Sequence, residues 1–265
     1  MSRDKTEGSF WDHLDILRTA IIKIIAVWVI LSLIAFLFKQ EVFDFILAPK
    51  TDSFITYRII DSICRRFGFN PLALINIELI NTGLAQQFVI HVQTAMCVGL
   101  ILTAPYALYE IFKFISPGLY SSERRYTLRI IVSSYIMFLI GLGLSYFLIF
   151  PMTFQFLGAY QVADDVVNLI SLDSYMATMI IMSLCMGVVC ELPVLAWLLA
   201  KMGLINSSVM TRYRKHAIVI ILIVAAVITP TSDIFTLLMV SVPIWILYEM
   251  SVLIVSANSN KERKE

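Results

Sequence analysis

A glutamate inside an apolar stretch is the first residue of this chain whose position could serve chemistry. Glu191 lies in the run VVCELPVLAW, nine residues before that stretch ends at Ala200. An ionisable side chain at the centre of a membrane helix costs about 2.5–3.5 kcal/mol, so a carboxyl retained there is a functional candidate. Pro193 follows two residues later and removes the hydrogen bond to the carbonyl of Val189, which predicts a bend. A carboxyl beside a bend could accept a polar group of a partner helix or substrate. The alternative is a protonated glutamate paired inside a helix bundle.

A second set of carboxylates lies in polar segments. Glu123 precedes the basic pair Arg124-Arg125 in KFISPGLYSSERRYTLR, where it could simply complement the positive end of a helix. Asp12 and Asp15 are three residues apart, so they share a face if the segment is helical. Two aspartates at this spacing resemble half of a magnesium site. A second acidic pair on the same side of the apolar stretches is missing, and we expect no metal and no cofactor.

The elements that must position these carboxylates are apolar. Of the 265 residues, 59% are hydrophobic and 15% are charged, and the mean hydropathy is +0.85. A soluble domain could not cover its surface with so few charges, so the bilayer is the natural solvent. A formal net charge of +1 excludes a nucleic-acid-binding protein that works by bulk electrostatics. The sequence also lacks a P-loop, HExxH and GxSxG, and we expect no enzyme.

Six apolar stretches predict an all-α, polytopic membrane protein. They run over about 20–38, 88–112, 130–150, 176–200, 217–228 and 234–255. We expect Pro105 to break the second stretch and Pro193 to break the fourth. The fifth has twelve residues, a helix of about 18 Å against a hydrocarbon core of about 30 Å, so it thins the bilayer, recruits polar flanks or re-enters. Glu110 and Glu249 lie near the ends of stretches, and we expect both to reach the lipid headgroups.

Basic residues gather at alternate ends of the stretches. They flank the first stretch, follow the second and the fourth, and recur in the tail, which places both termini in the cytoplasm. The segment over 39–87 is then a long outer loop, in which 44–46 and 53–63 could form short amphipathic helices. No linker divides the chain. We therefore expect one membrane domain over 1–265, with an amphipathic cytoplasmic N-terminus over 1–19 and a polar cytoplasmic tail over 256–265.

Taken together, these segments resemble the TatC family of Sec-independent protein translocases. The resemblance covers about 10–251 and is carried, in this order, by HLDILR (13–18), Ala48-Pro49, FISPGLYSSERR (114–125), YFLIFP (146–151), CELPV (190–194), ITP with Asp233 (228–233) and VPIWILYE (242–249). It implies six spans arranged as a cupped hand, with short fifth and sixth helices. It also implies a non-enzymatic export component of the bacterial inner membrane that uses the proton-motive force.

The resemblance implies partners and site residues as well. The partners are the twin-arginine signal peptides of folded precursors and single-span TatA/TatB-type subunits, in homo- and hetero-oligomers within the lipid bilayer. The family's signal-peptide motif falls on Phe114, Pro117, Leu119, Tyr120 and Glu123. A carboxylate there would prefer an arginine pair to a lysine pair, because a guanidinium binds a carboxylate in a bidentate manner. The intramembrane glutamate falls on Glu191, and the outer-loop motif falls on Pro49 and Asp233.

Two positions depart from the family pattern. The family motif HLxELR has a glutamate where this chain has Ile16, and the acid here is Asp15, about 100° away around a helix. Asp15 could still reach an arginine, or Asp12 could substitute for it. Many family members carry a polar residue four positions after the equivalent of Asp233, where this chain has Leu237. A polar contact for a partner helix would then have to come from another residue.

The alternative function is a proton-coupled small-molecule secondary transporter with Glu191 as its proton carrier. The first three and the last three stretches show no repeat symmetry, and no polar pathway crosses several stretches, so the sequence disfavours it. The outer loop over 39–87 looks longer than is usual in the family. The sequence assigns no role to its extra length.

Overall fold

The computed structural model describes residues 4–68, 78–115, 127–161, 163, 168–229 and 233–262. The chain divides into two compact units. The first unit combines Met1–Lys39 with His91–Ile136, and the second combines Gln40–Ile90 with Met137–Glu265. Each unit is held together by its own contacts, and each presents a different part of the predicted site.

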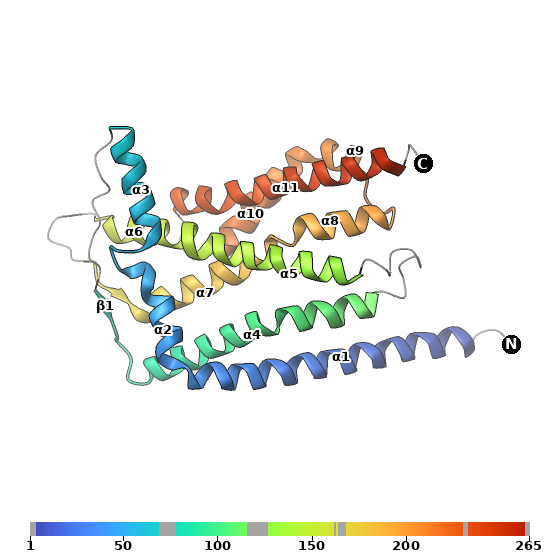
Figure 1. Cartoon of the computed structure of the whole chain (residues 1–265), viewed down its shortest axis with the longest axis horizontal. Coiled ribbons are helices and arrows are strands. Elements are labelled where there is room, and N and C mark those ends of the chain that lie inside the picture. The colour runs from blue at the N-terminus through green and yellow to red at the C-terminus, as the bar shows by residue number, and fades with distance from the viewer. Residues whose placement is uncertain are drawn as a thin grey trace. The chain divides into compact units, whose positions relative to one another are not determined.

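The first unit is built on two long helices, α1 (Asp4–Leu37) and α4 (Gln86–Ile115), with the start of α5 (Thr127–Leu144). The indole N–H of Trp28 donates to the Met96 carbonyl at 2.8 Å, and the rings of Phe36 and His91 stack with centroids 4.0 Å apart. These contacts make α1 and α4 antiparallel neighbours (Figure 1). The break expected at Pro105 is wrong, because α4 continues through that residue as one helix.

The second unit begins with the segment that the sequence predicted as an outer loop, and this segment holds two short helices. They are α2 (Lys39–Leu47) and α3 (Ile55–Arg66), joined by the 3₁₀ turn η1 (Ala48–Lys50). Both helices fall where the sequence predicted short helices, so that prediction is confirmed. The strand β1 (Leu79–Ile80) pairs in parallel with β2 (Ile170–Ser171), a contact that sequence patterning did not predict.

The rest of the second unit is helical. After α5 come the π-helical turn η4 (Ser145–Ile149), α6 (Phe150–Ala159), α7 (Leu172–Val189), α8 (Leu192–Lys201), α9 (Ser207–Arg212), α10 (Arg214–Ile228) and α11 (Ile234–Glu262). Helix α11 packs along both α8 and α10. It continues through Pro243, as α4 does through its own proline.

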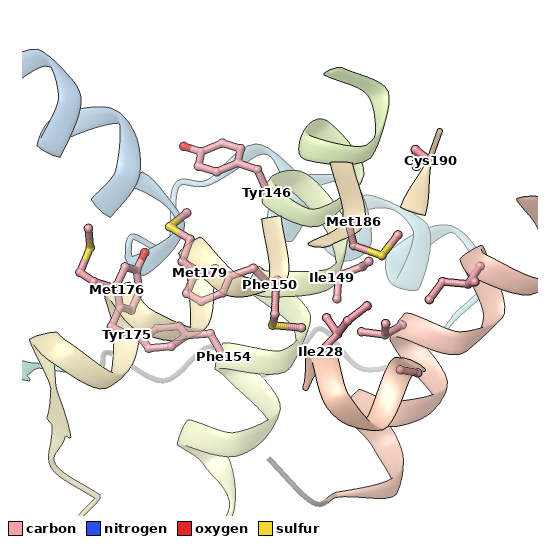
Figure 2. Packing of buried hydrophobic residues seen from close by; sticks show 14 of the residues in the cluster. Tyr146, Ile149, Phe150, Phe154, Tyr175, Met176, Met179, Met186, Cys190 and Ile228 are labelled. Atoms are coloured by element: carbon pink, nitrogen blue, oxygen red, sulfur yellow. The ribbon is translucent and has the colours of Figure 1, made fainter. Parts of the chain in front are cut away.

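The core of the second unit combines aromatic rings with methionines. Tyr175 meets Phe150 and Phe154 edge to face, with ring centroids 4.9 and 5.1 Å apart (Figure 2). Four methionines of α7 recur at helical spacing and are buried, at 176, 179, 182 and 186. Unbranched thioether chains adapt to the irregular gaps between rings, so this face of α7 fills the space against η4 and α6.

Five helical runs in the described part of the chain are long and apolar enough to cross a membrane. They are Leu14–Leu37, Gln86–Phe114, Ile130–Ala159, Leu172–Lys201 and Ile234–Ala257. The chain is therefore an all-α, multi-pass membrane protein, as the sequence predicted. The third run extends nine residues past the predicted end. Pro151 lies in the first turn of α6, and the Phe147 carbonyl, to which it offers no N–H, accepts a hydrogen bond from Thr56 of α3 instead. The 15 residues of α10 give about 22 Å, so a sixth span remains a prediction.

Candidate functional site

The first unit places an exposed carboxylate at the start of a membrane span. Asp15 lies in α1, one residue after the span begins at Leu14, and its side chain is exposed. Its backbone carbonyl accepts a hydrogen bond from Thr19 Oγ1 at 2.8 Å, while its carboxylate forms no ion pair with any described residue. Ile16, at the position of the family glutamate, is exposed as well. Asp12 also lies in α1, but its side chain is outside the described residues.

Helix α4 brings two further candidate residues to the same end of the unit, since α1 and α4 are antiparallel. Glu110 is only 7% exposed, and its Oε1 accepts a hydrogen bond from the hydroxyl of Tyr106 at 2.9 Å. The expectation that Glu110 reaches the headgroups is therefore wrong. The signal in the sequence was Tyr106, four residues earlier on the same face. Phe114 is half-buried in the last turn of α4, which ends at Ile115.

The remaining residues of the predicted signal-peptide motif are in the segment that joins α4 to α5. Pro117, Leu119, Tyr120 and Glu123 all lie outside the described residues. The segment leaves α4 directly after the turn that holds Phe114. The described structure thus brings Asp15, Glu110 and Phe114 to one end of the first unit, and Glu123 follows in sequence from that end.

Glu191 occupies a break between two helices of the second unit. Helix α7 ends at Val189 and α8 begins at Leu192, so the break predicted beside Pro193 is confirmed. The Glu191 N–H donates to the Val188 carbonyl at 3.1 Å, and the Glu191 carbonyl accepts from the Leu195 N–H at 2.9 Å. Backbone hydrogen bonds therefore fix the main chain on both sides of the break, where the Glu191 side chain is half-buried.

Two glycines fix the helix that precedes this break. A Cβ atom on Gly141 of α5 would lie 2.4 Å from the Met186 carbonyl oxygen and 2.8 Å from Cys190 Sγ. A Cβ atom on Gly187 of α7 would lie 2.7 Å from the ring of Phe138. Small residues allow membrane helices to approach with their backbones in contact. This close contact sets the position of α7 immediately before Glu191.

Pro49, one of the two residues of the predicted outer-loop motif, is held by a side chain of α3. Pro49 is buried in η1, and the hydroxyl of Tyr57 donates to its carbonyl at 2.9 Å and to the Pro151 carbonyl at 3.2 Å. Burial raises the pKa of Tyr57 to about 12. Thr56 Oγ1 donates to the carbonyl of Phe147, the group to which Pro151 has no N–H to offer. Helix α3 thus supplies the hydrogen-bond donor that the backbone of the YFLIFP motif lacks at Pro151.

Two more tyrosines, one in η4 and one in α7, form hydrogen bonds with α2. The Tyr146 hydroxyl donates to the Phe45 carbonyl at 2.5 Å, and the Tyr175 hydroxyl donates to the Ile46 carbonyl at 3.0 Å. Sequence reasoning missed these tyrosines, because each reaches a carbonyl 101 or 129 residues away along the chain. Together with Tyr57, they make the outer-loop helices part of the core of the second unit.

The last two helices carry the remaining predicted acids. Asp233 Oδ1 accepts a hydrogen bond from the Thr236 N–H at 2.7 Å, so this acid caps the start of α11. Glu249 of α11 forms an ion pair with Arg214 of α10, with a nitrogen–oxygen distance of 2.8 Å. That pair differs from the expectation that Glu249 simply reaches the headgroups. Within the ranges that the structure describes, no group of three His, Cys, Asp or Glu side chains could hold a metal ion.

Known proteins of one family match this chain over most of its length. The family model of the Sec-independent protein translocase protein TatC matches residues 12–243. The TatC protein of Blattabacterium sp. subsp. Periplaneta americana is 34% identical over 259 residues, which cover 96% of this chain and 97% of that protein. TatCy of Bacillus subtilis (strain 168) is 34% identical over 182 residues, 69% of this chain and 71% of that protein.

Solved structures agree with the sequence matches. A crystal structure of the twin arginine translocase receptor TatC has a TM-score of 0.73 at 28% identity, and covers 91% of this chain and 97% of its own. A second crystal structure of that receptor, in DDM, has a TM-score of 0.76 at 27% identity, and covers 92% of this chain and 99% of its own. The chain therefore belongs to the TatC family, and it is a multi-pass membrane component of the Sec-independent protein translocase.

Proposed function

We propose that this translocase component is the receptor that reads the arginine pair of twin-arginine signal peptides. The observation that carries the proposal is the exposed carboxylate of Asp15 at the start of the α1 span, at the end of the first unit from which the Glu123 segment leaves. A carboxylate at that level can meet a peptide that lies on the membrane surface. The crystal structures with the same fold are of proteins described as twin arginine translocase receptors.

The chemistry of the pair explains why arginine would be preferred. A guanidinium presents a planar fork of donors and binds a carboxylate through two parallel hydrogen bonds, whereas a lysine ammonium is a point charge. Glu123 meets one arginine in this proposal, and Asp15 or Asp12 meets the other. In this proposal Phe114, Pro117, Leu119 and Tyr120 bind the signal peptide together with Glu123. Glu110 stays buried against Tyr106 and supports that end of α4.

Glu191 has a different part in the proposal. It is a half-buried carboxyl at a helix break whose position is fixed by backbone hydrogen bonds and by the glycine contacts of α5 and α7. Such a group can accept a polar group from a single-span partner helix of the TatA/TatB type, or from the inserted signal peptide. The proposal also includes six spans with both termini in the cytoplasm. It further includes assembly into oligomers and export driven by the proton-motive force. Pro49 and Asp233 stabilise the outer face.

The experiment is an export assay with a twin-arginine precursor in cells that carry single variants of this chain. Glu123→Ala is expected to abolish export, and Glu123→Gln is expected to do the same, because the amide lacks the charge. Glu41→Gln is the matched control, since Glu41 is an exposed acid of α2 in the outer loop. Normal export by Glu123→Ala, at the wild-type level of protein in the membrane, would overturn the proposal.

A further inference from the structure

Helix α3 has an exposed face that the proposed signal-peptide site does not use. Its inner face buries Thr56 and Tyr57. On the other side, large apolar side chains recur every four residues and remain exposed: Ile55 at 54%, Ile59 at 53%, Ile63 at 50% and Phe67 at 72%. Residues four apart are neighbours on a helix, so these four form one stripe along α3 and its end. We call this set the α3 stripe.

Basic side chains accompany the α3 stripe. Arg58, Ser62 and Arg66 join its three isoleucines in lining a shallow hollow of about 300 Å³. Arg65, on the flank, is paired with Asp61 at 2.8 Å, whereas Arg58 and Arg66 form no ion pair with any residue that the structure describes. The α3 stripe therefore places exposed isoleucines next to two guanidinium groups that no described acid neutralises. Such a face is complementary to a surface on which apolar chains lie next to anionic groups.

The attachment of α3 sets its level relative to the membrane. The third span ends at Ala159, and α3 is bonded to it through the carbonyls of Phe147 and Pro151. Pro151 lies eight residues before that end, which is about 12 Å along a helix. Helix α3 is therefore attached to the last part of the span, close to one of its ends. It also runs across the direction of α6 and α11 rather than along them (Figure 1), as a helix in the membrane plane does.

We infer that α3 is an interfacial helix that binds the phospholipid surface of the bilayer. The α3 stripe lies among the upper parts of the acyl chains, and Arg58 and Arg66 bind the phosphates of anionic phospholipids. This inference goes beyond signal-peptide recognition, and it involves none of the residues assigned to that function. It gives a role to part of the long outer loop.

Spin labels on the full-length chain in nanodiscs test this inference. A label is placed at Ile59 or Ile63, or as a control at the exposed Asp52 before α3, after the four native cysteines have been replaced. The nanodiscs contain phosphatidylcholine and phosphatidylglycerol. If the stripe is in the bilayer, the ratio of oxygen to water-soluble nickel accessibility is about tenfold higher at 59 and 63 than at 52. Equal ratios at all three positions would overturn the inference, and so would shielding of 59 and 63 from both reagents, since that indicates a protein cover.

The arginines are tested separately by native mass spectrometry of the full chain with phosphatidylglycerol. The double variant Arg58→Gln/Arg66→Gln is expected to bind phosphatidylglycerol about 30-fold more weakly than the wild type, since each arginine near an anionic surface contributes about 1 kcal/mol. Arg65→Gln is the matched control, because Asp61 already neutralises that guanidinium. Unchanged retention in the double variant would contradict the assignment of these two arginines to lipid phosphates.

Discussion

The two units of this protein treat their apolar surface differently. In the first unit, only 11% of the most apolar part of the α1 span and 28% of that of the α4 span are buried. In the second unit, the corresponding share is 39% for both Leu172–Lys201 and Ile234–Ala257. The second unit buries more of its side chains in a packed core, whereas the first unit leaves helix faces and the carboxylate of Asp15 exposed. The difference suggests that stability resides mainly in the second unit and recognition in the first.

The prediction with the largest effect concerns the glycine contact of the second unit. Gly141→Ala places a methyl group where its carbon would lie 2.4 Å from the Met186 carbonyl oxygen, so α5 and α7 must separate. We expect the free energy of unfolding to fall by about 3 kcal/mol or more, because the clash is with backbone atoms and whole helices must shift to relieve it. The loss is measured as the decrease in the temperature at which the purified protein in detergent unfolds and ceases to be monodisperse. Gly143→Ala is the matched control, since a Cβ there meets only a Phe147 ring atom at 4.0 Å. Equal stability of the two variants would mean that the close contact contributes little.

The next prediction concerns the attachment of the outer loop to the second unit. Tyr57→Phe removes the hydroxyl that donates to the Pro49 and Pro151 carbonyls. Because buried carbonyls are then left without their donor, we expect the free energy of unfolding to fall by about 2 kcal/mol. Thermal unfolding of the two proteins in detergent measures this difference. Tyr160→Phe serves as control because Tyr160 is 65% exposed, and an equal effect of both changes would argue against the role of Tyr57.

The same tyrosine predicts a pH dependence. The pKa of Tyr57 rises from 10.0 to about 12 in the folded protein. A folded-state pKa above the unfolded value stabilises the fold fully below about pH 10, and that contribution is lost as the pH rises toward 12. The stability difference between the wild type and Tyr57→Phe should therefore narrow over this range. A difference that stays constant from pH 10 to 12 would show that the Tyr57 phenol does not ionise in this way.

A smaller effect is expected from the corresponding glycine of the first unit. A Cβ on Gly99 would lie 2.7 Å from the Ser32 backbone nitrogen, so Gly99→Ala pushes α1 away from α4. Because α1 has few other buried contacts, we expect it to shift at a cost of about 1 kcal/mol, less than for Gly141→Ala. The shift should also quench or redshift the fluorescence of Trp28, whose N–H donates to Met96. A stability loss as large as that of Gly141→Ala would remove the contrast between the units.

The smallest effect belongs to the ion pair between α10 and α11. The side chains of Arg214 and Glu249 are 45% and 26% exposed, and partly exposed pairs contribute about 0.2–1 kcal/mol. A double-mutant cycle with Arg214→Ala and Glu249→Ala measures the coupling, which should shrink at high salt. A coupling well above 1 kcal/mol would mean that this pair is a structural anchor.

Much of the fold could be predicted from local sequence. Apolar stretches of about 19 to 25 residues located the long helices, and amphipathic spacing located α2 and α3. The effects of proline could not be predicted in this way. Pro105 and Pro243 lie inside continuous helices, whereas Pro193 follows a break and Pro151 follows a π-helical turn. At Pro151 the outcome depends on a tertiary partner, because the carbonyl that this proline leaves open is taken by a threonine 91 residues away.

The candidate site was also predictable only where its residues depend on local sequence. The sequence predicted a bend beside Glu191, where the structure has a helix break. It indicated Pro49 and Asp233 only as outer-loop positions, and it predicted neither the buried turn of Pro49 nor the helix start that Asp233 caps. The burial of Glu110 was missed because its place near the end of an apolar stretch outweighed Tyr106, the hydrogen-bond partner four residues earlier on the same helix. The parallel pairing of β1 with β2 was also missed, since two-residue strands leave no periodic pattern.

The most direct test of the account is capture of a signal peptide by the purified full-length chain in detergent. A fusion bearing a twin-arginine signal peptide is compared with its Lys-Lys variant, and the chain is used as wild type, Asp15→Asn, Glu123→Gln and the control Glu41→Gln. The account predicts that the wild type and the control capture the Arg-Arg form at least about tenfold better than the Lys-Lys form. It also predicts that Asp15→Asn and Glu123→Gln reduce that preference. Equal capture of both peptides by the wild type, or an unchanged preference in both carboxylate variants, would contradict it.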